Sequence, residues 1–519
     1  MQGDNRRETW GTKIGLILAL AGNAIGIGNF LRFPVQAAQN GGGAFMIPYF
    51  VALILMGVPL MWVECAIGRM GGRYGHGHTA GMFGLLWRHR SSKYLGMLGL
   101  FIPFTIALYY IYITAWTVGY GYFSLSGDYF GVTTREAMGS YLRGFQGVES
   151  NQYFSGIGTA YIFFIITLAI SLYIVHHGVR GGIETLAKVG IPFLFLVGVV
   201  LMIRVLTFGT PDPNYPDRNV LNGLGFVWNP QPERLTDASI WLAAAGQIFF
   251  TLSIGAGCIP TYASYMREED DVALTGLSTV SLNELSEVIF GGTIAITAAV
   301  VFFGLPETEA IARGGAFNLG FQALPIIFQQ IPLGALFGTL WFVLLFFAAI
   351  NSLVALTEPM MALFQDGFGW SRWKATCAVL GALFLGSQPV IFFLKHGFLD
   401  ELDFWLGSFG LVVFALVEAI LFAWVFGMEK GWAEIIRGAA IPVPRIFYYL
   451  IKYVTPLFLL FILCAWAIRD APGKILMVGV NPEDVPYLWG ARLMMVVILV
   501  GFALLVKAAT SRIDRGVQP

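Results

Sequence analysis

The stretch best suited to binding chemistry is rich in glycine and lies inside a long apolar run. Residues 21–29 read Ala-Gly-Asn-Ala-Ile-Gly-Ile-Gly-Asn, within an apolar segment from Ile14 to Ala38. Glycine at this density weakens a helix, so we predict a break in it. Unpaired backbone groups are costly in hydrocarbon, so such a break persists only where it lines a buried polar cavity or binds a ligand.

A break of this kind offers two sorts of binding group. Amides freed at Ile27 and Gly28 would face a carboxylate, because a helix N-terminus attracts anions. Carbonyls of Gly22, Ala24 and Ile25 could coordinate a hard monovalent cation. The sequence therefore predicts a site for a zwitterion and a cation at the two ends of one break.

A second interruption lies far downstream. Residues 250–257 read Phe-Thr-Leu-Ser-Ile-Gly-Ala-Gly, near the centre of the charge-free run 238–266. Thr251 offers a hydroxyl there, and Asn29 adds a side-chain oxygen at the first break. Two interrupted spans in corresponding halves of a polytopic chain indicate a binding site between them. The alternative is close helix packing, for which the Gly-x-x-x-Gly spacing also suffices.

The composition is that of a membrane protein. The 519 residues are 57% hydrophobic and 12% charged, whereas soluble chains carry about 25% charged residues. The net charge of zero argues against a nucleic-acid partner. We find no nucleotide-binding motif, organic cofactor signature or catalytic triad, so the sequence does not indicate an enzyme, and any pumping must use an ion gradient. The four cysteines are expected to be buried free thiols.

About twelve apolar stretches are long enough to cross a core of about 30 Å. They lie at residues 14–38, 44–67, 95–124, 157–176, 187–208, 239–263, 274–304, 334–364, 375–394, 402–427, 446–468 and 487–507. Lys and Arg gather before the first stretch, in the second and tenth connections and after the last, so we expect both termini in the cytoplasm. The longer outer connections, 126–156, 209–238 and 305–333, could carry short helices or a lid.

Ionisable side chains inside these stretches are functional hypotheses, because they are costly at that depth. Arg32 and Asp403 could close an ion pair over the site from outside, although Arg32 could equally extend to lipid headgroups. On the inner face, Arg7 and Asp366 have the charges for a second gate. Tyr110 could donate to a carboxylate, or serve as a core aromatic.

Further carboxylates also lie within the apolar runs. Glu64 and Glu418, like Glu284 and Glu287, could satisfy backbone groups at a break, whereas Glu358 is expected in a wetted inner vestibule. The histidine pairs in the inner connections have no ligands at metal-binding spacing, so a metal site there is not favoured.

Five motifs make the chain resemble the neurotransmitter:sodium symporter family. The resemblance runs from about Trp10 to about Tyr453 and is carried by residues 22–34, 40–45, 246–253, 261–265 and 315–321. It implies an all-α integral membrane fold of about twelve helices, the first and sixth being broken. The implied division is a cytoplasmic segment 1–13, two inverted five-helix repeats at 14–208 and 239–427, two extra helices at 446–507 and a tail at 508–519.

The resemblance also assigns site residues. The substrate would contact Ala24, Ile27, Gly28, Ile106, Tyr110, Phe250, Thr251, Ser253, Ala256, Ser352 and Leu356. One sodium would bind at Ala24, Asn29, Thr251 and Asn283, and a second at Gly22, Ile25, Ala348, Asn351 and Ser352. The outer gate would be Arg32 and Asp403 with Tyr110 and Phe250, and the inner gate Arg7, Ser264, Tyr265 and Asp366, with Trp10 packed beside it.

Three positions refine these expectations, and at one of them, Glu287, chloride-independent bacterial members of the family also have a carboxylate. Asn351 stands where relatives usually have Thr or Asp, so its sodium site lacks a formal charge. Glu287 stands among Tyr49, Gln247, Thr251 and Asn283, where animal relatives hold chloride, and a fixed carboxylate predicts chloride independence, with proton exchange through it possible. A leucine-carrying member has phenylalanine at the place of Ala256, so a larger pocket is expected here.

The resemblance therefore predicts a symporter that imports neutral, mainly apolar and possibly aromatic L-amino acids by alternating access. Two sodium ions, an amino acid and the lipid bilayer are the expected partners. The chain would lie in the plasma (inner) membrane as a monomer or homodimer. The alternative is a membrane sensor that binds an amino acid without transporting it.

Overall fold

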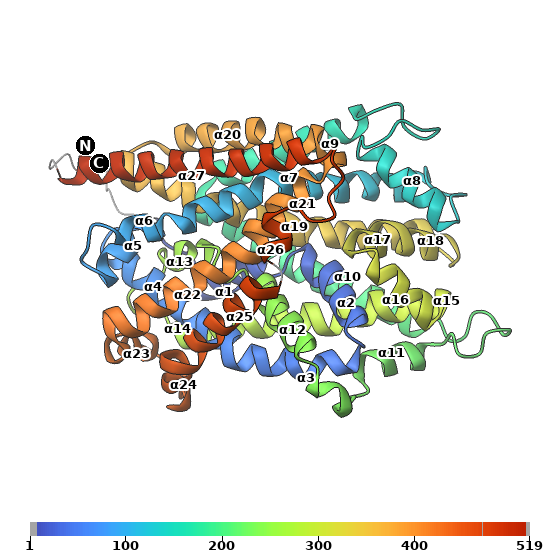
Figure 1. Ribbon diagram of the computed structural model, residues 1–519, viewed down its shortest axis with the longest axis horizontal. Coiled ribbons are helices and arrows are strands. Elements are labelled where there is room, and N and C mark those ends of the chain that lie inside the picture. The colour runs from blue at the N-terminus through green and yellow to red at the C-terminus, as the bar shows by residue number, and fades with distance from the viewer. Residues whose placement is uncertain (1–7, 470, 515–519) are drawn as a thin grey trace.

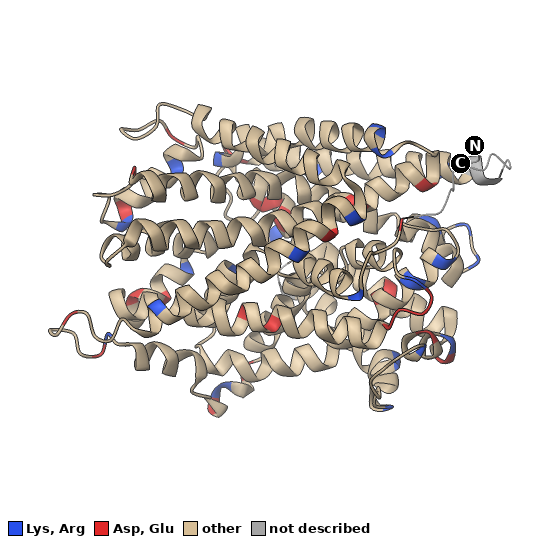
Figure 2. Ribbon diagram, turned by 180° about the vertical axis from the view of Figure 1, so that it is seen from behind, with Lys and Arg blue, Asp and Glu red and all other residues tan. Residues whose placement is uncertain are grey.

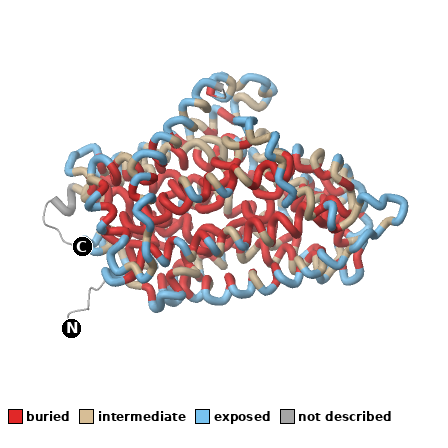
Figure 3. The backbone as a smooth tube through the Cα atoms, turned by 90° about the horizontal axis from the view of Figure 1, so that it is seen from below, coloured by how far each residue is buried: buried red, intermediate tan, exposed pale blue. Residues whose placement is uncertain are grey.

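The computed structural model describes residues 8–469 and 471–514, and in these residues the secondary structure is entirely helical. The long helices run side by side along the longest axis of the molecule (Figure 1). Buried residues fill the middle of the bundle and exposed residues cover its outside, as Figure 3 shows.

The first half of the chain supplies helices from α1 to α11. Their bounds are α1 (Lys13–Ala24), α2 (Ile27–Gln39), α3 (Gly43–Ala52), α4 (Val58–Arg73), α5 (Thr79–Leu86), α6 (Ser92–Gly96), α7 (Leu98–Ser126), α8 (Arg135–Phe145), α9 (Gly158–His176), α10 (Thr185–Leu206) and α11 (Val220–Trp228). The π-helical turns η1 (Leu53–Gly57) and η2 (Val179–Glu184) lead into α4 and α10.

The second half supplies the remaining helices. Their bounds are α12 (Ala238–Leu252), α13 (Cys258–Ala263), α14 (Val272–Glu284), α15 (Thr297–Phe303), α16 (Leu305–Arg313), α17 (Ala316–Asn318), α18 (Leu324–Gln329), α19 (Gly334–Phe368), α20 (Arg372–Phe392), α21 (Phe398–Leu402), α22 (Leu411–Ile420), α23 (Met428–Ile436), α24 (Ile446–Tyr449), α25 (Thr455–Arg469), α26 (Ala471–Ile475) and α27 (Val485–Asp514). The π-helical turns η4 (Leu285–Ile296), η5 (Leu319–Ala323), η7 (Asp403–Gly410), η8 (Leu421–Gly427) and η9 (Leu450–Val454), and the 3-10 turns η3 (Pro232–Thr236) and η6 (Leu394–His396), lie beside or between these helices.

Ten of the described helices, counted across their π-helical turns, are long and apolar enough to cross a membrane, and the bent pair α1 and α2 makes an eleventh. The expected stretch 239–263 is divided between α12, a shorter apolar helix, and α13. Each of the twelve predicted stretches therefore lies on helix, and the multi-pass membrane fold is confirmed.

The first predicted break is present. α1 ends at Ala24, Ile25 and Gly26 are extended, and α2 begins at Ile27 after a bend of 48°. Asn29 caps the N-terminus of α2, because its Oδ1 accepts a 2.8 Å hydrogen bond from the Gly26 amide. Glycine at residue 26 lets the chain turn beside Tyr110 and Ser352, whose oxygens would lie about 3 Å from any added Cβ.

The second predicted break is also present, between α12 and α13. Ser253, Gly255 and Gly257 all have positive φ, at 54°, 76° and 76°. A Cβ on Gly255 would lie 2.1 Å from the Leu411 carbonyl oxygen, and one on Gly257 would lie 2.3 Å from that of Gly99. Both positions therefore require glycine for conformation and for space.

The connections predicted to lie outside carry short helices, as expected: α8, α11 and the series α16 to α18. Figure 2 shows Lys and Arg gathered in loops at the opposite end of the bundle, where Figure 1 places α5, α6 and α23. The cysteine prediction was wrong in part. Cys65 and Cys258 are buried free thiols, whereas Cys377 and Cys464 are exposed free thiols.

Candidate functional site

A cavity of about 340 Å³ lies between the two breaks. Binding cavities for small molecules usually measure about 300–1,000 Å³. Every residue that the resemblance assigns to the substrate lines this cavity, from Ala24 on α1 to Leu356 on α19. The two broken helices and the long helices α7 and α19 therefore form its walls.

One end of the cavity is polar. The Ile27 amide donates a 3.2 Å hydrogen bond to the Tyr110 hydroxyl, so an amide freed by the first break and a phenol meet there. Gly28 lies against the ring of Phe250, which a Cβ on Gly28 would approach to 2.4 Å. This end can bind a carboxylate through an amide and a hydroxyl, beside the Phe250 ring.

The other end is apolar. Ile106, Ala256 and Leu356 line it, and Leu411 from α22 adds to the wall. Ala256 is 2% exposed and stands between the two positive-φ glycines of the second break. Its small side chain leaves room beside the break for a larger apolar group of a ligand.

Three of the four predicted residues of the first sodium site come together around Glu287. The side chains of Asn29, Thr251 and Asn283 are hydrogen-bonded to one another at 2.8–3.4 Å. Glu287, on η4, is fully buried beside them. Ala24, Asn29 and Thr251 also line the cavity.

The Glu287 carboxylate accepts from four side chains. Gln247 Nε2 donates at 2.6 Å to one oxygen, while Asn29 and Asn283 donate at 3.3 Å to the other, together with the Thr251 hydroxyl. Tyr49 donates at 2.8 Å to Glu284 instead. A negative group at this place thus satisfies four buried donors at once.

Four of the five predicted residues of the second sodium site lie together: Gly22, Ala348, Asn351 and Ser352. The Ser352 hydroxyl lies 3.3 Å from the Ala348 carbonyl oxygen and 3.4 Å from that of Gly22. The Asn351 amide nitrogen donates at 2.7 Å to the Phe347 carbonyl, and its Oδ1 lies 2.9 Å from where a Cβ on Gly22 would stand. The amide oxygen is therefore directed towards the first break, where it can act as a neutral ligand.

On the outer side, Arg32 and Asp403 line the same cavity without pairing in the part of the chain that the structure describes. The Arg32 guanidinium stacks 3.9 Å from the centre of the Phe250 ring, and its Nη1 has no hydrogen-bond partner among the described residues. Asp403 accepts a 2.7 Å hydrogen bond from Tyr109. The charged groups of Arg32 and Asp403 therefore both line the cavity but form no ion pair with each other.

On the side predicted to be inner, Trp10 packs against the second broken segment. The Trp10 indole donates at 2.9 Å to the Tyr262 carbonyl, and its ring lies 5.4 Å from Tyr262 and 6.3 Å from Tyr265 in edge-to-face contacts. Ser264 bonds the Thr261 carbonyl, and Asp366 accepts from the Gly77 amide. Arg7, the remaining predicted gate residue, lies outside the described residues.

The prediction that Glu358 lies in a wetted inner vestibule is wrong. Glu358 is fully buried and receives two hydrogen bonds, of 3.1 and 3.0 Å, from Arg372 on α20, and a third, of 2.8 Å, from Tyr265. A buried carboxylate needs a charge partner, and Arg372, on the next helix, supplies it without water.

Glu184 anchors the segment that precedes α1. Its carboxylate accepts hydrogen bonds from the Gly11 amide at 2.7 Å, the Thr12 amide at 3.1 Å and the Thr12 hydroxyl at 2.9 Å, and Lys188 pairs with it at 2.6 Å. This contact fastens the segment before α1 to the start of α10.

Replacing Glu184 with alanine should free that segment. Removing an acceptor of three hydrogen bonds costs about 2 kcal/mol locally, so amide exchange over residues 8–12 should become about tenfold faster or more. Hydrogen-exchange mass spectrometry of the reconstituted protein measures this. Glu149→Ala, in an outer loop, is the matched control, and unchanged exchange in Glu184→Ala would contradict the assignment.

Sequence reasoning missed several groups at the site. Tyr109, which bonds Asp403, adjoins the predicted Tyr110 and could have been found by that proximity. Gln36, Phe317 and Leu399 also line the cavity. Phe317 lies in the motif 315–321, whereas no local signal in the sequence distinguishes Gln36 and Leu399 from packing residues.

Comparison with known proteins agrees with this geometry. The model of the sodium:neurotransmitter symporter family matches residues 7–130 and 130–510. An uncharacterized sodium-dependent transporter of Methanocaldococcus jannaschii is 32% identical over 468 residues, covering 87% of this chain and 89% of that protein. The sodium-dependent nutrient amino acid transporter 1 of Drosophila melanogaster is 25% identical over 475 residues, covering 82% and 72%.

A solved structure shows the same architecture. The crystal structure of MhsT in complex with L-phenylalanine superposes with a TM-score of 0.75 at 28% identity, covering 89% of this chain and all of that one. The resemblance stated from the motifs is confirmed. The broken helices, the cavity between them and these matches together place the chain in the sodium:neurotransmitter symporter family, as a sodium-coupled membrane transporter and not an enzyme.

Proposed function

We propose that this protein imports neutral, mainly apolar L-amino acids together with sodium, by alternating access and without chloride. Large and aromatic side chains are accepted at least as well as leucine. The observation that carries the proposal is the cavity between the two breaks, polar at the Ile27 amide and apolar at Ala256.

The two ends of the cavity match the two ends of an amino acid. The Ile27 amide and Tyr110 hydroxyl suit its carboxylate, and the carbonyls at the first break suit its ammonium group. Residue 24 is alanine, so no side-chain carboxylate there competes with the substrate's own. The ligand L-phenylalanine in MhsT supports a substrate of this class.

Two sodium ions are proposed at the sites described above. The first uses Ala24, Asn29, Thr251 and Asn283 with the substrate carboxylate, and the second uses carbonyls of α1 and α19 with Asn351 and Ser352. Each sodium that crosses at about 100 mV contributes roughly 2.3 kcal/mol, which corresponds to about fifty-fold accumulation.

The proposed orientation follows the positive residues in the inner loops. Both termini are cytoplasmic, the membrane is the plasma (inner) membrane, and the protein is a monomer or homodimer. The repeats at 14–208 and 239–427 provide the two moving halves, and the helices in 446–507 flank them.

Uptake of labelled L-phenylalanine into proteoliposomes tests this function. An inward sodium gradient with an inside-negative potential of about 100 mV should drive accumulation of at least about fifty-fold over the potassium control. A competition panel of the twenty amino acids should rank apolar and aromatic ones first. Binding without accumulation would indicate a sensor. Uptake that is equal when potassium replaces sodium would overturn the symporter proposal.

A further inference from the structure

The helix that carries Asp403 turns one side to the cavity. The cavity is lined by Leu399, Asp403, Gly407 and Leu411, which follow one another at intervals of four residues through α21, η7 and the start of α22. Residues four apart lie on the same side of a helix. The Asp403 carboxylate is therefore part of one continuous helix face, and its direction depends on how that helix is rotated about its axis.

Gly407 leaves the space that this direction requires. A Cβ on Gly407 would lie 2.5 Å from Asp403 Oδ1 and 2.8 Å from the Tyr109 hydroxyl, which donates to that same Oδ1 at 2.7 Å. Tyr109 belongs to α7, so the contact joins two helices in the cavity wall. Rotation of the helix would carry the carboxylate away from Tyr109 and out of the cavity lining.

The opposite side of the same helix is bound by α27. Glu401, two residues before Asp403, points away from the cavity, since two residues turn an α-helix by about 200°. Its Oε1 accepts hydrogen bonds from Arg492 Nε at 2.6 Å and from the Trp405 indole at 2.8 Å. The side chains of Glu401 and Arg492 are only 5% and 14% exposed, so this ion pair is shielded from water and salt.

Arg492 is itself held by backbone groups. Its Nη1 donates to the Ile475 carbonyl at 2.9 Å, and its Nη2 donates to the Lys474 carbonyl at 2.7 Å. These two residues end α26, where helical carbonyls have no partner within the helix. A planar guanidinium bound through three of its nitrogens has little freedom to move, so it fixes the position of the Glu401 carboxylate.

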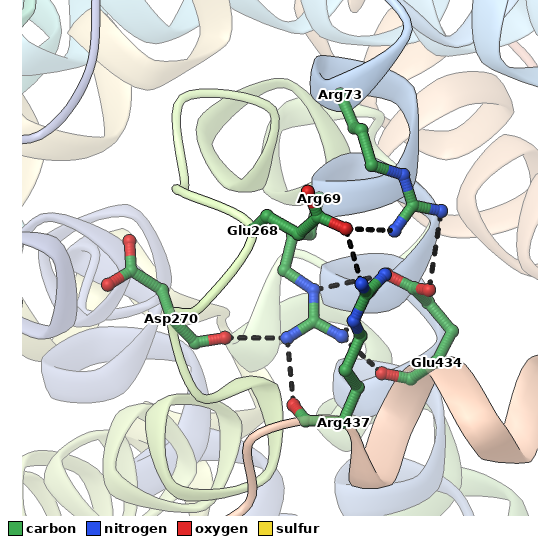
Figure 4. Close-up of polar contacts among 6 residues, drawn as sticks. All are labelled: Arg69, Arg73, Glu268, Asp270, Glu434 and Arg437. Carbon is green, nitrogen blue, oxygen red and sulfur yellow. Dashed lines mark hydrogen bonds and ion pairs between the residues drawn. The ribbon is translucent and has the colours of Figure 1, made fainter.

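Figure 4 shows the same kind of anchor at the end of the bundle where α23 lies. Arg69 on α4 pairs with the Glu434 carboxylate at 3.1 Å. It also donates to the carbonyls of Asp270 and Arg437 at 2.6 and 3.1 Å. Neither Arg69 nor Glu434 lines the cavity. This anchor joins helices without reaching the cavity, so it provides a structural comparison for Arg492.

We propose that Arg492 and Glu401 are positioning residues for the outer gate, because they hold α21 in the rotation at which Asp403 faces the cavity. No described residue of α27 lines the cavity, yet this helix sets the direction of the carboxylate that Arg32 meets when the gate closes. The inference rests on the proposed function, since it takes Arg32 and Asp403 as the outer gate.

Cross-linking measures the direction of residue 403 without any substrate. Tyr109→Cys and Asp403→Cys place two thiols in the cavity lining, and Cys377→Ala and Cys464→Ala remove the two exposed native thiols. In the purified full-length protein, a short bifunctional methanethiosulfonate should join the two new cysteines, and mass spectrometry of the peptides gives the yield. Adding Arg492→Gln should lower this yield about threefold or more, since a broken buried ion pair no longer holds the helix.

Three further variants separate positioning from general loosening. Arg492→Lys, which keeps a charge for Glu401, should restore part of the yield. The double variant Glu401→Gln with Arg492→Gln leaves no unpaired buried charge and should give the same low yield, so it replaces Arg492→Gln if that variant does not fold. Arg69→Gln is the matched control and should leave the yield unchanged, because it removes a buried guanidinium elsewhere while Arg73 still pairs with Glu434 at 3.5 Å. Equal yields with and without the Arg492 substitutions, or an equal fall with Arg69→Gln, would overturn the inference.

Sodium-driven uptake of L-phenylalanine gives a second measurement. Arg492→Gln should raise the KM about threefold or more when Asp403 is present, and less than about twofold in an Asp403→Asn background, since an amide has no charge to meet Arg32. The same factor in both backgrounds would assign Arg492 a merely structural role and overturn the inference. Absence of uptake in the wild type, with the expected cross-linking pattern, would count only against the proposed function.

Discussion

The variant Ala256→Phe should lose large amino acids and keep small ones. Ala256 is buried in the apolar wall, and the positive-φ glycines on either side restrict how the backbone could yield. A phenyl ring there fills the space that an aromatic substrate would occupy. We expect this overpacking to reduce the binding free energy of phenylalanine by about 2 kcal/mol, which corresponds to an approximately thirty-fold higher KM. Sodium-driven uptake in proteoliposomes measures this KM.

The comparison with small substrates makes this prediction specific. The KM for alanine or valine should change by less than about threefold, since these side chains do not reach the new ring. Ala256→Gly is the matched control and should leave phenylalanine uptake in place. An equal loss for all substrates would mean that residue 256 supports the break and does not set the size of the pocket.

The variant Glu287→Ser should require chloride. Four donors, from Asn29, Gln247, Thr251 and Asn283, converge on the Glu287 carboxylate. Truncation leaves these buried donors without an acceptor, at about 1–3 kcal/mol for each group left unsatisfied. A chloride ion in the vacated space would accept from the same donors and restore the negative charge.

Uptake should therefore fall by about tenfold or more when gluconate replaces chloride in Glu287→Ser, and stay constant in the wild type. Glu284→Gln is the control for a neighbouring buried carboxyl, because Glu284 accepts from Tyr49 at 2.8 Å and shares only Asn283, at 3.4 Å, with this set of donors. If Glu287→Ser transports at any rate without depending on chloride, the hypothesis that the fixed charge replaces an anion is wrong.

The breaks could be predicted from sequence because their cause is local. Glycine at residues 22, 26 and 28, and again at 255 and 257, weakens helix wherever the rest of the chain lies. The corresponding positions of the two breaks in the chain indicated a site between them, and the family motifs then assigned Ile27, Tyr110 and Ala256 to it.

The side-chain partners could not be predicted in this way. Glu358 and Arg372 lie on different helices, and nothing in one sequence indicates that their charges meet. The same is true of Glu184 with the chain before α1, and of Tyr109 with Asp403, 294 residues apart. Such pairs depend on how helices rotate against one another, so hydropathy placed Glu358 in water when it was in fact buried.

The closeness of Gly255 to the Leu411 carbonyl and of Gly257 to the Gly99 carbonyl has a mechanical consequence. No side chain lies between these groups, so backbone atoms contact backbone atoms at both places. A movement of the second break towards either carbonyl would therefore press directly on α22 or α7, without any change of side-chain rotamer.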